Sequence, residues 1–353
     1  MALLIKKSLI CKNIEQYAID TALADNYLPV AGDVALFKVI CLGKHTRVSD
    51  ETGRNRLILP GDYLLCAFGN RYATNQIEGY VPDSIQSVYH MLGQGGVVGI
   101  VKSLFKPIEK QGPTTLQLIG YATNENGEVL NTKQAFEDNI RYLKPVGLQS
   151  KVILSVGTSM DSGKTTTAGY LCRGLSRAGY KTAYMKLTGT VFYKDPEFAV
   201  DCGANLAIDF SHFGFPSTYM CSETELLQLY YNLLKKLEPE SPDFIVIEIA
   251  DGLLQRETAM LLRNERFMET VFDVIFSAGD SMGLLYGLQW LEKLGITPFA
   301  VGGCFTISPL LMQEVREHVN VNILPLDQLE NPESVMSALL TSVQPIQSTA
   351  HVA

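Results

Sequence analysis

The chain lacks both the cysteine spacing of a structural zinc site and the long apolar run of a membrane span. Its 7 cysteines are scattered, and no two of them form a C-x-x-C pair, so the usual zinc spacing is excluded. An odd number of scattered cysteines is typical of reduced thiols, and a cytoplasmic location is expected. No stretch approaches ~20 apolar residues without a charge or a turn residue, so we expect no membrane span or membrane partner.

Positive charge is also scarce. The 29 Lys and Arg residues are outnumbered by 37 Asp and Glu residues, which gives a formal net charge of -8. This balance argues against nucleic acid or anionic lipid as a partner. Hydrophobic residues make up 46% of the chain, which is enough to form a core and excludes a disordered chain. A length of 353 residues predicts about two domains.

The first half of the chain has the pattern of closely spaced strands. From about residue 26 to 121, short apolar clusters such as DVALFKVICLG and GGVVGIVKSLF are separated by Gly, Pro, Asn and Asp. Strands with little helix between them predict a β-rich barrel or sandwich domain over residues 1–148. Two of its polar loops fit a polyanion contact, a cover over a nucleotide site, or ordinary hairpin tips; they contain His45, Arg47, Asn70, Arg71 and Tyr72.

The second half alternates strands with helices. KVILSVG, YKTAYMKL and DFIVIEIADG are expected strands, and helices are expected over about 164–178 and after the S-x-x-E capping box at residues 222–225. This alternation predicts an α/β domain over 149–353, with a mostly parallel sheet and helices on both faces. Ligands of such sheets bind at the carboxyl ends of the strands.

A phosphate-binding loop is expected between the first of these strands and its helix. The stretch GTSMDSGKTT ends in Gly-Lys-Thr, but its first glycine lies one residue further upstream than in G-x-x-x-x-G-K-[ST]. Backbone amides and the helix N-terminus would face phosphate, Lys164 would bind it, and Thr165 would ligate Mg²⁺. A plain strand–helix turn is the alternative. The expected ATP and Mg²⁺ site comprises Gly157, Thr158, Ser159, Met160, Asp161, Ser162, Gly163, Lys164, Thr165 and Thr166.

The base of the nucleotide is predicted from a missing motif. The chain has no N-K-x-D guanine-reading motif, and the expected strand end GGCFTISP lacks it too. ATP is therefore expected rather than GTP.

The longer loop resembles that of dethiobiotin synthetase and the related cobyrinic acid amidation enzymes, which read G-T-x-x-x-x-G-K-T. Further matches follow in order over about residues 151–329: Lys186 in YMKLTGT, Glu248 in IEIADG, and Asp280 with Gly283 in AGDSMG. The resemblance implies a P-loop fold, a homodimer, and ATP-dependent phosphoryl transfer or ligation on a small-molecule carboxylate.

This sequence also departs from the family pattern. Leu187 replaces a proline, and Ile249 and Asp251 replace two glycines, so the family's diaminopelargonate substrate is not carried over. The chain is also similar to a poorly characterised P-loop family with a GTDxxxGK loop and a β-rich N-terminal half. One branch of that family is linked to N-acylation of amino acids.

The matching positions imply roles in catalysis. Glu248 would bind Mg²⁺ directly or through water, Asp251 would be a second metal ligand or a helix cap, and Lys186 would neutralise charge near the γ-phosphate. A solvated strand-end carboxylate and a surface lysine are the simpler interpretations of Glu248 and Lys186. Asp161 would repel a triphosphate unless it holds Mg²⁺, positions a substrate amine, or points outward.

The segment between the second and third strands, residues 187–221, is expected to contact the acceptor because it shows little periodic pattern. His212 is either a general base or an ordinary loop histidine. Arg256, after the third strand, is either a clamp on phosphate or part of a surface ion pair. The candidate acceptor contacts are Thr188, Asp195, Asp209, His212, Ser217, Thr218, Tyr219 and Arg256.

The main functional prediction is a P-loop ATP-dependent kinase or ligase that uses ATP, Mg²⁺ and a small-molecule acceptor. One alternative is a CoA-dependent N-acyltransferase in which the loop holds the CoA diphosphate. The other is a nucleotide-hydrolysing switch or chaperone that acts on a protein partner. Fold alone does not separate these three functions.

Overall fold

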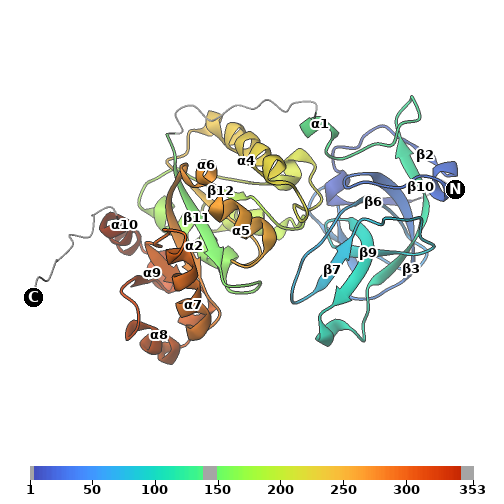
Figure 1. Ribbon diagram of the computed structural model, residues 1–353. Coiled ribbons are helices and arrows are strands. Elements are labelled where there is room, and N and C mark those ends of the chain that lie inside the picture. Colours follow the sequence, from blue (N-terminus) through green and yellow to red (C-terminus); the bar gives the residue numbers. More distant parts are fainter. Residues whose placement is uncertain (1–3, 138–148, 343–353) are drawn as a thin grey trace, which may run out of the picture. The chain divides into compact units, whose positions relative to one another are not determined.

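The computed structural model describes residues 4–137 and 149–342, and they divide between two compact units. The domain boundary predicted at residue 148 lies outside the described residues. The N-terminal unit comprises Met1–Val146, Lys186–Glu197 and Ile208–Lys236. The C-terminal unit comprises Gly147–Met185, Phe198–Ala207 and Leu237–Ala353. Figure 1 shows both units.

The N-terminal unit is built on a sheet that closes on itself. Its strand order is β1-β6-β3-β10-β8-β9-β7, β2 pairs with β10, and β6 also pairs with β9, which completes a ring through β6, β3, β10, β8 and β9. This confirms the predicted β-rich unit. The strands are β1 (Ile5–Lys7), β2 (Ala18–Asp20), β3 (Val34–Cys41), β6 (Tyr63–Phe68), β7 (Ile77–Tyr80), β8 (Tyr89–Gly93), β9 (Val97–Leu104) and β10 (Thr114–Thr123), and a separate hairpin joins β4 (Arg47–Ser49) and β5 (Asn55–Leu57).

Aromatic rings fill the interior of this closed sheet. The rings of Phe37, Phe68 and Tyr89 pack edge-on with centroids 5.5 to 5.9 Å apart, and Tyr121 stacks on Phe68 at 6.0 Å. All four side chains are buried. Each large ring removes much apolar area from water, which explains how short strands hold a stable core.

Two stretches from the second half of the sequence belong to the N-terminal unit through specific contacts. Thr190 and Ser217 form a β-bridge. The Thr132 hydroxyl donates to the Gly214 carbonyl at 2.6 Å, and the hydroxyls of Tyr80 and Tyr219 lie 3.1 Å apart. The region 187–221 therefore contains more order than its sequence pattern indicates, including α3 (Lys194–Asp201), β13 (Leu206–Asp209) and the 3-10 turn η4 (Phe210–Phe213).

The second half carries a seven-stranded sheet of order β13-β12-β14-β11-β15-β16-β17. β11 pairs in parallel with both β14 and β15, and β15, β16 and β17 continue in parallel. The α/β prediction is confirmed. The strands are β11 (Lys151–Gly157), β12 (Thr182–Lys186), β14 (Phe244–Glu248), β15 (Val271–Ser277), β16 (Ala300–Gly302) and β17 (Asn322–Ile323).

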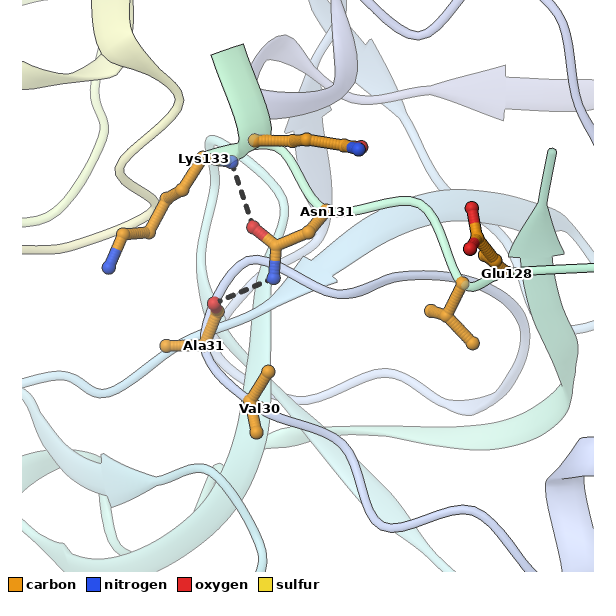
Figure 2. A pocket seen from close by; sticks show the side chains of 7 residues that line it. Val30, Ala31, Glu128, Asn131 and Lys133 are labelled. Carbon is orange, nitrogen blue, oxygen red and sulfur yellow. Dashed lines mark hydrogen bonds between the residues drawn. The ribbon is translucent and has the colours of Figure 1, made fainter. Parts of the chain in front are cut away.

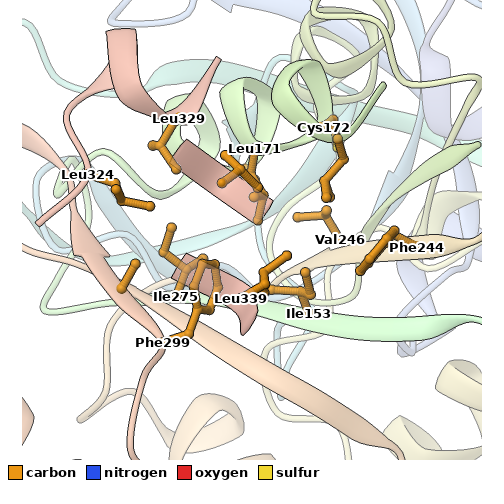
Figure 3. Close-up of a cluster of buried hydrophobic side chains, with 14 of the residues drawn as sticks. Ile153, Leu171, Cys172, Phe244, Val246, Ile275, Phe299, Leu324, Leu329 and Leu339 are labelled. Atoms are coloured by element: carbon orange, nitrogen blue, oxygen red, sulfur yellow. The ribbon is translucent and has the colours of Figure 1, made fainter. Parts of the chain in front are cut away.

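Helices cover both faces of this sheet because neighbouring residues of a strand point to opposite sides. Ile275 joins a buried cluster with side chains of α2, α9 and α10, drawn in Figure 3. Phe276, the next residue, contacts Gly287 of α7. The helices of the C-terminal unit are α2 (Lys164–Arg177), α5 (Arg256–Arg263), α6 (Glu265–Met268), α7 (Ser281–Glu292), α8 (Pro309–Arg316), α9 (Leu326–Leu329) and α10 (Pro332–Ser342). Two further helices, α1 (Gln134–Glu137) and α4 (Glu223–Leu237, except its last residue), belong to the N-terminal unit.

In the part of the chain that the structure describes, no helix has the length and apolar character that crossing a bilayer requires.

Candidate nucleotide site

The phosphate loop, residues 157–166, joins the end of β11 to the start of α2. β11 is a central strand whose residues after Lys151 are all buried, as its continuous apolar run predicts. Gly163 precedes the helix with φ of 99°, a conformation that favours glycine. A Cβ at this position would also lie 2.9 Å from Gly303 Cα. The loop therefore places the N-terminus of α2, the positive end of the helix dipole, at the carboxyl edge of the sheet.

Lys164 points back into this loop. Its side chain is buried, and Nζ donates a hydrogen bond to the Ser159 carbonyl at 2.7 Å. A buried ammonium group held over backbone turns beside a helix N-terminus concentrates positive charge at one place. This arrangement suits a bound anion such as phosphate.

A carboxylate lies beside the first turn of α2. The Thr165 hydroxyl donates to Glu248 Oε1 at 2.9 Å, and the Tyr184 hydroxyl donates to Glu248 Oε2 at 2.5 Å. Glu248 is the last residue of β14 and is only 2% exposed, so its carboxylate is buried and not solvated. Tyr184 comes from β12, and its role was not predicted from the sequence.

The donor set at this carboxylate fits Mg²⁺. Hydroxyl and carboxylate oxygens are the hard ligands that Mg²⁺ prefers, and Mg²⁺ usually takes its other ligands from water and phosphate. Within the described residues, no group of three or more His, Cys, Asp or Glu side chains could hold a metal ion. Thr165 and Glu248 would therefore hold the ion jointly with a bound phosphate.

Two further loops are hydrogen-bonded to the phosphate loop. The Leu253 amide donates to the Gly157 carbonyl at 3.0 Å. The Cys304 amide donates to the Ser162 carbonyl at 3.1 Å, and its thiol donates to the Asp161 carbonyl at 3.2 Å. The contact at Cys304 was missed in the sequence. The paired glycines at 302 and 303 are the one signal that a backbone passes closely there.

Gly252 provides a test of this packing. A Cβ at Gly252 would lie 2.4 Å from the Thr158 carbonyl oxygen and 2.7 Å from Ser159 Cα. We expect Gly252→Ala to lower the unfolding free energy by about 1–3 kcal/mol, because backbone must move on one side of the contact. Denaturant unfolding of the purified variant measures this loss.

Gly279→Ala is the matched control, since no atom lies within 4 Å of a Cβ there. We expect its unfolding free energy to stay within about 0.5 kcal/mol of the unaltered chain. Equal stabilities of the two variants would contradict the close packing of the two loops.

Other predicted site residues of the C-terminal unit have local partners. Asp280 caps α7 by accepting from the Gly283 amide at 2.7 Å. Arg256 forms an ion pair with the buried Glu257 at the start of α5. The Asp161 side chain is exposed, and Asp251 is half-buried.

The remaining candidates belong to the N-terminal unit, and they are Lys186, Thr188, Asp195, Asp209, His212, Ser217, Thr218 and Tyr219. Lys186 is buried and pairs with Asp195. Thr188 is buried, and the Ser217 hydroxyl accepts from the Tyr219 amide at 3.1 Å. The predicted role of Lys186 near the γ-phosphate and the predicted acceptor contacts of the other residues stay predictions.

Asp209 and His212 hold the η4 turn together. The Asp209 carboxylate accepts from the Ser211 amide at 2.9 Å, and His212 Nδ1 lies 3.2 Å from its Oδ1. Burial raises the pKa of Asp209, but the hydrogen bonds and charge of its neighbours, His212 foremost, outweigh burial and leave this pKa below its usual value. The pair forms a capping box, a structural role.

The N-terminal unit also has a hollow of about 580 Å³. Figure 2 shows two hydrogen bonds among its lining residues: Asn131 Nδ2 donates to the Ala31 carbonyl at 3.0 Å, and the Lys133 amide donates to Asn131 Oδ1 at 2.8 Å. None of the predicted site residues lines it. We assign no chemistry to this hollow.

Comparison with known proteins does not assign this chain to a family. No protein-family profile and no curated protein matches the chain. Similar solved structures include FtsY from Mycoplasma mycoides, with 13% identity over 60% of this chain and 75% of that chain and a TM-score of 0.36. Another is the signal recognition particle 54 kDa protein from Aeropyrum pernix K1 in complex with GDP, with 16% identity over 58% of this chain and 52% of that chain and a TM-score of 0.35. A third is a GTPase in apo form from Pyrococcus abyssi, with 16% identity over 55% of this chain and 98% of that chain and a TM-score of 0.33.

Similarity at this level carries no argument about what the chain binds or does. The loop between β11 and α2, the lysine within it, and the strand-end carboxylate decide the class of the fold. The C-terminal unit is an α/β fold with a P-loop between β11 and α2. The finer likeness to dethiobiotin synthetase stays a prediction.

Proposed function

We propose that this chain binds a nucleoside triphosphate with Mg²⁺ on the phosphate loop and hydrolyses its terminal phosphate bond. The observation that carries the proposal is the Thr165–Glu248 hydrogen bond at 2.9 Å, formed beside the lysine that points into the loop. The Thr165 hydroxyl, the buried Glu248 carboxylate and the Lys164 ammonium group all lie near the N-terminus of α2. P-loop enzymes that transfer phosphoryl groups use a lysine to bind the phosphates, and a hydroxyl and a carboxylate to hold Mg²⁺.

Each group has a distinct role in this proposal. Loop amides and the α2 N-terminus bind phosphate oxygens, and Lys164 neutralises charge that develops on them. The Thr165 hydroxyl and Glu248 hold the metal position. Mg²⁺, when bound there, would supply positive charge and act as a Lewis acid.

Hydrolysis that operates a switch is favoured over transfer to a small molecule. The side chains expected to assist transfer are bound locally: Lys186 to Asp195, His212 to Asp209, and Arg256 to Glu257. Phosphoryl transfer to a carboxylate is the second candidate, and the order of the Lys186, Glu248 and Asp280 motifs supports it.

Phosphate release and calorimetry test the proposal together. We expect the purified chain to release phosphate from ATP or GTP only with Mg²⁺, and parallel assays with the two nucleotides identify the base. Addition of small carboxylates shows whether an acceptor raises the rate. Binding of CoA in the calorimeter, with no affinity for either triphosphate, would contradict the proposal and favour an acyltransferase.

A further inference from the structure

Tyr184 is a buried tyrosine whose hydroxyl binds the strand-end carboxylate of Glu248. It lies in β12 with no exposed surface, and the adjacent strand β14 carries Glu248. The tyrosine ring belongs to the same buried cluster as Ile153 and Val246. Packing alone would be satisfied by phenylalanine, because a hydroxyl adds nothing to apolar contact and must be hydrogen-bonded when buried.

The two oxygens of Glu248 are divided between two donors. Tyr184 donates to Oε2 at 2.5 Å, and Thr165 donates to Oε1 at 2.9 Å. Two donors on different oxygens restrain rotation of the carboxylate about its last bond. A carboxylate held in this way presents a fixed oxygen to whatever binds beside Thr165.

We propose that Tyr184 is a positioning residue for the metal-binding carboxylate. It holds Glu248 Oε2, so that Oε1 faces Thr165 and the metal position. Outer groups of this kind orient carboxylates at metal sites and set metal affinity. The inference rests on the proposed function, and it adds a residue on a neighbouring strand to the site.

The test is the Mg²⁺ dependence of binding of a non-hydrolysable triphosphate analogue to Tyr184→Phe. We expect the Mg²⁺ concentration at half-saturation to rise about 10-fold or more, while analogue binding in EDTA stays unchanged. Tyr180→Phe is the matched control: its ring packs edge-on to Phe244 with centroids 5.1 Å apart. The control should show the Mg²⁺ dependence of the unaltered chain.

A double-mutant cycle separates positioning from packing. In a Glu248→Ala background, Tyr184→Phe should change Mg²⁺ dependence no further, because its target is gone. The inference is overturned if Tyr184→Phe shifts the half-saturating Mg²⁺ concentration equally in the native and Glu248→Ala chains, or does not shift it in the native chain. The proposed function would still stand after either result. Absence of any Mg²⁺-dependent analogue binding by the unaltered chain overturns the proposed function and the inference with it.

Discussion

Replacement of Lys164 by alanine should weaken triphosphate binding by about 100-fold. Lys164 Nζ lies 2.7 Å from the Ser159 carbonyl, within the turn that the phosphates would enter. A hydrogen bond to a charged group is worth about 1.5–3 kcal/mol, and the upper part of that range corresponds to about 100-fold in affinity. Calorimetric titration with a non-hydrolysable analogue measures the change.

Lys181→Ala is the control for loss of a positive charge. Lys181 pairs with Glu240 at 3.0 Å, and both side chains are exposed. Its removal should leave the affinity within a factor of about two, since exposed ion pairs contribute little. If Lys164→Ala binds the analogue as well as Lys181→Ala does, the loop is not a phosphate site.

Glu248→Gln should reduce Mg²⁺-dependent phosphate release by about 100-fold or more. The substitution keeps the size of the side chain but removes the negative charge that would hold the metal position beside Thr165. Loss of one group that stabilises charge in a transition state commonly lowers turnover by 10²–10³-fold. Steady-state phosphate release at saturating nucleotide measures the loss.

The same variant should show the opposite effect on binding without metal. Removing a buried negative charge beside the phosphates lowers repulsion, so nucleotide affinity in EDTA should be equal or higher. Glu240→Gln is the control, because Glu240 is the exposed ion-pair partner of Lys181. It should change neither the rate of phosphate release nor the nucleotide affinity in EDTA. Full activity of Glu248→Gln would remove this carboxylate from the mechanism.

The sequence predicted those parts of the site that are contiguous or lie at the end of an apolar strand. Gly-Lys-Thr between a buried strand and a helix located the phosphate loop, and Glu248 was found as the last residue of another buried strand. The alternation of elements predicted the α/β sheet, and the turn-rich first half predicted the β-rich unit. Each rests on local patterns, which sequence spacing reports directly.

The missed parts are tertiary neighbours. Tyr184 meets Glu248 because β12 lies beside β14 in the sheet, an order that no local pattern encodes. Cys304 contacts Asp161 of the phosphate loop although the two residues lie 143 positions apart along the chain. The elements α3 and β13 are short, and their apolar residues are too few to show a period.

The most direct measurement is a crystal structure of the chain with Mg²⁺ and a non-hydrolysable triphosphate analogue. We predict phosphate oxygens within hydrogen-bonding distance of Lys164 Nζ, the metal ion on the Thr165 hydroxyl, and Glu248 Oε1 facing the ion while Tyr184 remains hydrogen-bonded to Oε2. An analogue bound elsewhere, with the Thr165–Glu248 hydrogen bond unchanged, would contradict the account.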